Sequence, residues 1–450
     1  MPDAAVSLDD KYTLESGRIF LTGTQALVRL PMMQRQRDQR AGLNTASFIS
    51  GYRGSPLGGV DQQLWRARKF LKQHHIHFQP GVNEELAATA IWGTQQANLF
   101  GDSLYDGIFS IWYGKGPGVD RSGDVFRHGN FAGSSQHGGV LLLAGDDHAA
   151  KSSTTAHQCE YAFMDVMVPV LNPAGVQEYL DLGLYGWALS RYSGCWVGFK
   201  AVTETVDSTA SCYVDPHRIQ IVQPSDFEMP AGGLNIRWAG ALDMLEQEER
   251  HHRYKLNAAL AFARANGLDR TVIDSPNRKV GIVTAGKSYL DVRQALDDLG
   301  IDEQMAKDIG LSLYKVAMTW PLEPQGIRAF CEGLDEVLVI EEKRPVIEPQ
   351  TKEQLYNWQG GKRPRVIGKF DRDLPDEPGD WLLPSYAELN PAQIGRAIST
   401  LLRRHGLVNE RLESRLRLLA DLEKRIGAQQ SPLKRIPHFC SGCPHNTSTK

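Results

Sequence analysis

The stretch NTASFISGYRGSPLGG, residues 44–59, decides the fold. Its first part, 44–52, is a short run of small and apolar residues that ends in turn residues, and such a run predicts a buried strand. Glycine and proline then mark a turn, and an amphipathic pattern predicts a helix from about residue 57 to residue 72. A strand, a glycine-rich turn and a helix in this order form the first half of a βαβ unit.

The same order of elements continues to about residue 206. Further strands are predicted over five stretches: 76–80, 106–114, 138–147, 168–173 and 195–204. Helical patterns separate them, most clearly over 83–99 and 174–192. Strands that alternate with helices predict the α/β class, with a parallel sheet that helices cover on both faces.

The alternation stops near residue 207, and this divides the chain. We predict a first domain over 1–206, a helical connector or insertion over 207–277, and a second α/β domain over 278–370. Residues 371–435 are predicted to form a linker and helices, and 436–450 the start of a further domain. The densest motif stands at the very end, so we expect the chain to be the N-terminal part of a longer polypeptide.

Composition excludes several classes of protein. A chain of 450 residues with 41% hydrophobic and 23% charged residues is typical of a globular protein of two or three domains. The net charge of -3 argues against a nucleic-acid or membrane-surface binder, and no apolar run reaches the ~18 residues of a membrane span. The first residues lack the apolar core of a signal peptide, and six cysteines without a secretion signal predict a cytoplasmic protein with no disulfide framework.

The turn after the first strand has the composition of a ligand-binding turn. Gly54 and Gly58 let the backbone approach a ligand closely. Ser55 offers a hydroxyl and Arg53 a cation, and ligands of open parallel sheets bind beyond the carboxyl ends of the strands. A purely structural connection that caps the next helix explains the same residues equally well, so both interpretations stay open.

A second glycine-rich turn, YGKGPGVDRSGD, covers residues 113–124. Its backbone N–H groups can hold an anion, and Lys115 and Arg121 can meet a carboxylate. The turn lacks the residue order of a P-loop, so nucleotide hydrolysis is not indicated. A solvated surface loop is the alternative.

Two stretches contain residues that bind metals. In GDDHAAKSSTTAHQ, residues 145–158, the acids and histidines invite a metal site, but their spacing fits no zinc signature and a capped loop is the preferred interpretation. In CSGCPH, Cys440 and Cys443 form the strongest local signal of the chain. Their spacing suits a zinc ribbon, an iron–sulfur cluster or a redox dithiol, and either metal site needs further ligands.

The helix start GVNEELAATAIWG, residues 81–93, places Glu84 and Glu85 directly before a stripe of alanine, isoleucine and tryptophan. Helix N-termini favour acids because the helix dipole and the free N–H groups attract negative charge. Two acids beside an apolar face raise the question whether one of them turns inward.

Together these stretches resemble the 2-oxoacid:ferredoxin oxidoreductases, most closely the indolepyruvate ferredoxin oxidoreductase branch. The matching stretches occur in family order: GYRGSPLGG, VNEELAATAIWG, LLLAGDDHAAKSS, VLVIEEKRPVIEPQ and FCSGCPH. The resemblance runs from about Leu21 to the last residue, although residues 207–276 match less clearly. No motif alone is decisive, but the ordered set is specific.

The resemblance implies a fold, an activity and partners. It implies a pyrimidine-type thiamine diphosphate-binding domain followed by a transketolase C-terminal-like α/β domain. Members of the family decarboxylate a 2-oxoacid, form an acyl-CoA, and pass electrons through [4Fe-4S] clusters to ferredoxin. The Mg²⁺-binding diphosphate domain is expected mostly beyond Lys450, so this chain alone is expected to be inactive. The implied partners are the 2-oxoacid, CoA, ferredoxin, the remaining domains of the polypeptide and a second copy in a homo-oligomer.

The resemblance assigns Glu84 to catalysis. Counted back from Gly93, Glu84 fits the spacing of the glutamate that hydrogen-bonds the aminopyrimidine ring and so promotes formation of the nucleophilic ylid. Glu85 is then an outward acid or a helix cap. Gly54 and Gly58 are assigned to the cofactor.

The resemblance also assigns substrate and cluster ligands. Ser55 stands where relatives have threonine, Arg53 replaces a proline, and Lys115 falls where some relatives place a basic residue near the substrate. Cys440 and Cys443 resemble the first two thiolate ligands of a [4Fe-4S] cluster. The histidine that follows Cys443 and Pro444 is shared with the indolepyruvate branch, which favours an aryl pyruvate as the substrate.

Two other functions stay open. A thiamine diphosphate-dependent decarboxylase or transketolase-like enzyme without a cluster has the same helix glutamate, with zinc or nothing at the cysteines. Iron–sulfur absorbance in the visible range separates it from the first function. A non-catalytic scaffold domain is the third possibility, against which an inward acid at residue 84 argues.

Overall fold

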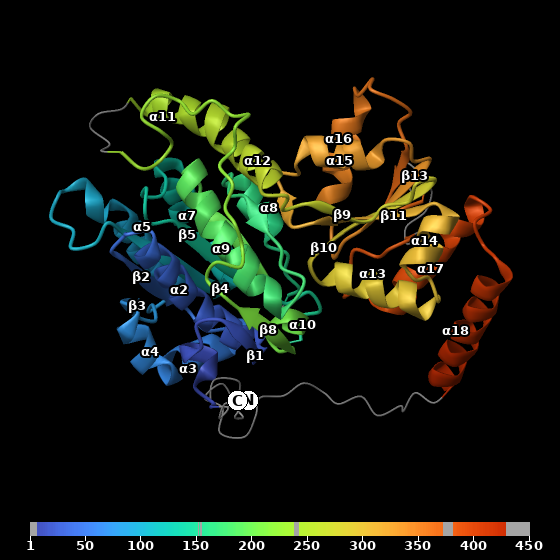
Figure 1. Ribbon diagram of the computed structural model, residues 1–450, viewed down its shortest axis with the longest axis horizontal. Helices are drawn as coiled ribbons and strands as arrows, with labels where there is room; N and C mark the ends of the chain where they lie inside the picture. Colours follow the sequence, from blue (N-terminus) through green and yellow to red (C-terminus); the bar gives the residue numbers. More distant parts are fainter. Residues whose placement is uncertain (1–6, 152, 154, 238–242, 372–380, 429–450) are drawn as a thin grey trace.

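The computed structural model describes residues 7–151, 153, 155–237, 243–371 and 381–428. They form two α/β units that lie side by side, each built around its own sheet (Figure 1). In the described part of the chain, no helix is both long and apolar enough to span a bilayer.

The first unit contains a seven-stranded sheet. In sheet order its strands are β12 (Met318–Trp320), β6 (Val170–Leu171), β7 (Val197–Val202), β5 (Val140–Asp146), β4 (Gly107–Lys115), β2 (Thr45–Gly51) and β3 (Ile76–Phe78). Neighbouring strands run parallel except β12, which pairs antiparallel with β6. The six predicted strands before residue 206 are all present, and the α/β class is confirmed.

Helices cover both faces of this sheet because its strands are apolar on both faces. In β5, Leu141 and Leu143 belong to the core on one face, whereas Leu142 and Ala144 belong to the core on the other. The covering helices are α2 (Gly23–Arg40) and α9 (Val176–Ser193) on the first face, and α5 (Glu84–Gln96), α7 (Gly123–Ala132) and α8 (Glu160–Asp165) on the second.

Shorter elements complete the first unit. They are α1 (Asp10–Thr13), β1 (Gly17–Thr22), η1 (Leu57–Gly59), α3 (Val60–Arg66), α4 (Arg68–Gln73), η2 (Ala97–Leu99), α6 (Gly116–Arg121), α10 (Thr203–Val206) and β8 (Thr209–Val214). Strands β1 and β8 form a separate antiparallel ribbon. The single helix predicted over 57–72 is wrong in detail, because it divides into η1, α3 and α4. Glycine weakens its first turn at Gly58 and Gly59, and the chain leaves helical geometry at Ala67.

A helical segment connects the two units. It consists of α11 (Met244–Arg250), a turn of π-helix, η4 (His251–Lys255), and α12 (Leu256–Ala265). Ala259, Phe262 and Ala263 enter the core under α9, so this charged amphipathic helix packs across the first unit as its pattern predicts.

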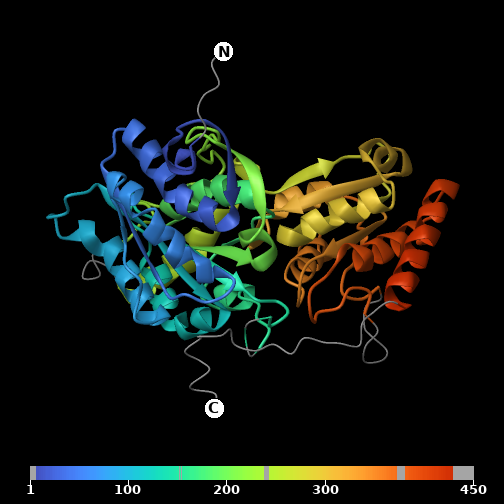
Figure 2. The ribbon, with the colours of Figure 1, turned by 90° about the horizontal axis from the view of Figure 1, so that it is seen from below.

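The second unit contains a five-stranded sheet. In sheet order its strands are β14 (Arg365–Ile367), β13 (Glu336–Ile340), β10 (Val280–Ala285), β11 (Leu311–Val316) and the antiparallel β9 (Arg270–Ile273). Its helices are α13 (Gly286–Asp298), α14 (Glu303–Ile309), α15 (Pro324–Cys331), α16 (Ile347–Tyr356), α17 (Pro391–Arg404) and α18 (Glu410–Ala428). Helix α18 forms the far end of this unit (Figure 2).

The two sheets are joined through one short stretch of chain. After β11 in the second sheet, the chain continues at once into β12, which adds an edge strand to the first sheet. An ion pair between Lys315 and Glu178 stands beside this crossing. The domain boundaries inferred from the sequence stay predictions.

Candidate active site

Three segments that follow neighbouring strands meet at the carboxyl edge of the first sheet. Strands β2, β4 and β5 are adjacent and parallel, with Gly51 opposite Tyr113 and Lys115 opposite Gly145. The turn 52–59 follows β2, helix α6 follows β4, and the loop 147–159 follows β5. This edge is where open parallel sheets bind their ligands.

The start of α5 is tied to the same edge. The backbone N–H of Gly81 donates to the carbonyl of Gly51, the last residue of β2, at 2.8 Å. The side chain of Asn83 caps the helix by accepting from the N–H of Leu86 at 2.8 Å. These bonds fix where the first residue of α5, Glu84, stands relative to the sheet.

Glu84 lies against the glycine-rich segment that follows β4. The indole N–H of Trp112 donates to the Glu84 carbonyl at 2.9 Å. A Cβ placed on Gly118 falls 2.5 Å from Glu84 Cγ and 2.9 Å from Glu84 Oε1, and one on Gly114 falls 3.4 Å from Glu84 Cγ. The glycines therefore leave the space that the half-buried Glu84 side chain occupies.

The two acids of α5 point to different surroundings. Glu85 is exposed, and its carboxylate lies 3.8 Å from Arg121 Nε at the end of α6. Among the described residues, the Glu84 carboxylate has no hydrogen-bond or ion-pair partner, so both oxygens are free to accept from a ligand.

The turn after β2 crosses the ends of the neighbouring strands. A Cβ on Gly54 falls 2.9 Å from Lys115 Cδ, so the lysine stem packs on the bare glycine backbone. A Cβ on Gly145 falls 2.8 Å from Leu57 Cγ, which places the turn over the end of β5 as well. The structure thus brings this turn and Lys115 together.

The remaining predicted residues of the turn are Arg53, Ser55 and Gly58. Ser55 and Arg53 are exposed, and a Cβ on Gly58 would meet nothing within 4 Å. Cys440 and Cys443, the predicted cluster ligands, lie outside the described residues.

A buried ion-pair cluster stands at the end of β5. Lys200 on β7 donates to Glu160 at 2.6 Å, and its Nζ lies 3.2 Å from Asp146. The backbone N–H of Cys159 donates to Asp146 at 3.0 Å. His157 lies between Asp146, at 3.3 Å, and Asp120, at 3.0 Å.

The neighbouring charges in this cluster set the pKa values of Asp146 and His157. Burial raises the pKa of Asp146, but Lys200 and His157 more than offset this, and the pKa lies well below its usual range. Burial lowers the pKa of His157, but Asp146 and Asp120 outweigh it and raise the pKa above its ordinary value. Asp146, Cys159 and Glu160 have ligand atoms within 4.8 Å of one another. The Lys200 ammonium pairs with two of them, so this cluster is an ion-pair centre, and the preference for a capped loop over a metal site in 145–158 stays a prediction.

Sequence reasoning missed three residues that shape this edge. They are Trp112, Gly118 and Lys200. Lys200 had a signal, since it is a lone lysine in the apolar strand 195–202. Gly118 had a weaker signal as part of the glycine-rich stretch 113–124 and Trp112 had none, because only the approach of α5 to β4 gives these two residues a role.

Comparison with known proteins agrees with this architecture. A model of the indolepyruvate ferredoxin oxidoreductase middle domain matches residues 269–429. The chain is 25% identical to indolepyruvate oxidoreductase subunit IorA of Methanothermobacter marburgensis over 442 residues, which cover 98% of this chain and 61% of that subunit. The subunit IorA of Pyrococcus abyssi is 23% identical, with 96% of this chain and 58% of that subunit covered. The chain therefore spans about three fifths of the length of these relatives.

A solved structure shares the fold. The 2-oxoglutarate:ferredoxin oxidoreductase from Magnetococcus marinus, with 2-oxoglutarate, coenzyme A and succinyl-CoA bound, superposes with a TM-score of 0.61 at 15% identity. The match covers 85% of this chain and 65% of that chain. The predicted succession of a thiamine diphosphate-type parallel-sheet domain and a transketolase C-terminal-like α/β domain is consistent with this likeness.

Proposed function

The chain belongs to the 2-oxoacid:ferredoxin oxidoreductase family, and from this premise we propose that it carries the aminopyrimidine-binding part of an enzyme that oxidises a 2-oxoacid. The proposed substrate is an aryl pyruvate such as indolepyruvate, which reacts with CoA to give an acyl-CoA and carbon dioxide. The electrons pass through iron–sulfur clusters to ferredoxin. The names of the IorA relatives support the substrate class.

The unpartnered carboxylate of Glu84 is the observation that carries this proposal. It stands half-buried at the carboxyl edge of a parallel sheet, and glycines at 114 and 118 make room for it. Thiamine diphosphate, when bound, supplies a carbon nucleophile and takes up the negative charge left by decarboxylation. We assign Glu84 to holding a proton at the aminopyrimidine ring, since a free carboxylate accepts such a hydrogen bond.

The substrate is assigned to the turn 53–55 and Lys115. The Lys115 ammonium attracts the carboxylate of a 2-oxoacid, and the packing of its stem on Gly54 restricts where that charge can lie. Ser55 offers a hydroxyl donor, Arg53 a second cation, and Gly58 an open backbone at the cofactor. Mg²⁺ and the [4Fe-4S] cluster, with Cys440 and Cys443 as cluster ligands, belong to the proposal but not to the described residues.

The partners and the location also belong to the proposal. They are CoA, ferredoxin, the remaining domains of the enzyme and a second copy of the chain. The four cysteines of the described residues are unpaired and buried, which suits a reducing cytoplasm.

Glu84 and its neighbour Glu85 allow a controlled test of the proposed function. In the holoenzyme, we expect Glu84→Gln to lower the indolepyruvate-dependent reduction of a viologen dye by about 10²–10⁴-fold, the usual contribution of a proton-transferring group. Glu85→Gln is the matched control, because Glu85 is exposed and faces Arg121, and it should keep most of the activity. Equal activity of both variants would contradict the assignment of Glu84. No reduction by wild-type enzyme with any 2-oxoacid would contradict the reaction class.

A further inference from the structure

A large cavity lies at the opposite, amino-terminal edge of the first sheet. Its volume is about 850 Å³, within the range of small-molecule sites. Leu43 and His137, which line it, lie in the segments that lead into β2 and β5. Strand β5 has seven residues, so ~20 Å of sheet separate this cavity from the Glu84 edge.

The fixed charges that line the cavity are mainly positive. They are Arg37, Arg40, Arg191 and Asp38. Asp38 neutralises Arg191 through two bonds of 2.7 and 2.8 Å. Glu15 meets Arg40 at 3.0 Å, but both side chains are well exposed and such pairs contribute little. Three arginines and one aspartate thus line the cavity, while Asp38 and Asp215 both act on the charge of Arg37.

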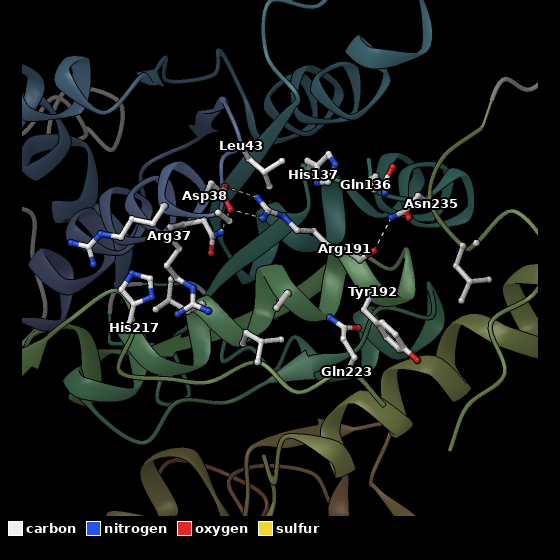
Figure 3. Close-up of a pocket in the computed structure, with 18 of the residues that line it drawn as sticks. Arg37, Asp38, Leu43, Gln136, His137, Arg191, Tyr192, His217, Gln223 and Asn235 are labelled. Atoms are coloured by element: carbon white, nitrogen blue, oxygen red, sulfur yellow. Dashed lines mark hydrogen bonds and ion pairs between the residues drawn. The ribbon is translucent and has the colours of Figure 1, made fainter. Parts of the chain in front are cut away.

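The guanidinium of Arg37 is held in place with donors to spare. Its Nη1 donates to the carbonyls of Pro216 and Ile219. Within the described residues, Nε and Nη2 of Arg37 have no hydrogen-bond partner. Figure 3 shows Arg37 and His217 at one end of the cavity, and Gln136, His137 and Asn235 at the other.

The cavity also has an apolar wall. Helix α9 contributes Leu184 and Ala188, and the segment before α11 contributes Ile221 and Met229. Arg191, one helical turn beyond Ala188, is locked by Asp38 and by a bond from its Nε to the carbonyl of Gly138 at 2.9 Å. A rigid apolar surface thus lies beside oriented cations, an arrangement that needs little reorganisation on binding.

We infer that this cavity binds a small organic anion whose charged head meets Arg37 and whose apolar body lies on α9. The positive lining selects the charge, the spare Arg37 donors select a carboxylate or phosphate, and the apolar wall selects against a bare inorganic ion. The site is distinct from the Glu84 edge and does not rest on the proposed function.

The test uses phenyl phosphate as the probe, in calorimetric titration of the full chain. We expect saturable binding that is tighter than that of inorganic phosphate and of benzyl alcohol. Arg37→Gln should weaken binding at least tenfold, while Arg66→Gln, an exposed arginine on α3 outside the cavity, should not. Ala188→Phe places a ring on the α9 wall, where the apolar body of the ligand is proposed to lie, without removing a hydrogen bond, and should weaken binding at least tenfold. Circular dichroism checks that each variant folds. If Arg37→Gln does not fold, the affinity of Ala188→Phe tests the inference.

Several results would overturn the inference. One is the absence of saturable binding by wild-type protein. Another is unchanged affinity in folded Arg37→Gln or Ala188→Phe. Loss of binding in Lys115→Gln would place the probe at the other edge of the sheet. Equal affinity for inorganic and phenyl phosphate would remove the apolar part of the proposed ligand.

Discussion

Replacement of Gly118 by alanine tests whether the glycine segment after β4 positions the Glu84 carboxylate. The added Cβ would lie 2.5 Å from Glu84 Cγ and 2.9 Å from Glu84 Oε1. Ordinary carbon–carbon contacts are ~3.5–4 Å, so the Glu84 side chain has to move by ~1 Å. A displacement of this size at a reacting group costs ~10²-fold in rate, and we expect a loss of that order.

The same replacement should leave stability nearly unchanged. Gly118 lies in α6 without a positive φ, and alanine is favoured over glycine in a helix by ~0.5–1 kcal/mol. Glu84 is half-buried at a helix start, so its carboxylate can swing aside and relieve the overlap. Activity and stability should therefore separate, unlike in a variant that loses activity because it unfolds.

The assay is anaerobic reduction of a viologen dye by the holoenzyme with indolepyruvate and CoA, alongside urea denaturation. Gly123→Ala is the control, because a Cβ there meets nothing within 4 Å. In a Glu84→Ala background, Gly118→Ala should add no further loss, since its target is gone. Wild-type activity in Gly118→Ala, or an equal loss in both backgrounds, would refute the reasoning.

Three further predictions concern buried charges. Lys200→Met leaves Asp146 and Glu160 without their cation and should lower the free energy of unfolding by ~3–5 kcal/mol in urea denaturation. Burial lowers the pKa of Lys255 to about 8 in the folded protein. Between pH 8 and the higher pKa of lysine in the unfolded chain, the unfolded chain binds more protons than the folded protein, so the free energy of unfolding rises with pH. In urea denaturation measured at a series of pH values, Lys255→Met should reduce the rise of the free energy of unfolding by up to ~1.4 kcal/mol per pH unit. Burial raises the pKa of Asp269 to about 7, so stability should fall as the pH rises from 4 to 7, and Asp269→Asn, which keeps the acceptor oxygen, should flatten that fall.

The parallel strands of the first sheet could be predicted because their signal is local, whereas β1, β8 and β12 were not predicted. A run such as 138–147 is apolar on both faces, and only a strand buried between two layers of helices accommodates it. The helix over 57–72 was harder to predict from the sequence. Glycine and small changes in backbone angle divide it into three shorter helices, while the amphipathic pattern of the residues continues through all of them.

The candidate site was predictable as a set of stretches but not as a geometry. The turn 51–59, the helix start at Glu84 and the segment after Tyr113 each carry composition typical of ligand binding. Their meeting at one edge follows from the parallel order of β2, β4 and β5, which depends on pairing between residues far apart in the chain.

By itself, the sequence determined the α/β class, the succession of elements, the family resemblance and the presence of two acids at the start of α5. Only the tertiary structure decided that Glu85 turns to Arg121 while Glu84 lies over Gly118. It also decided that Lys200 pairs with Asp146 at the end of β5 and with Glu160, and that an arginine-lined cavity opens at the far edge of the sheet. The physical reason is that periodicity and turn composition act over a few residues. The direction of a side chain and the partner of a buried charge depend instead on which distant segments pack against it.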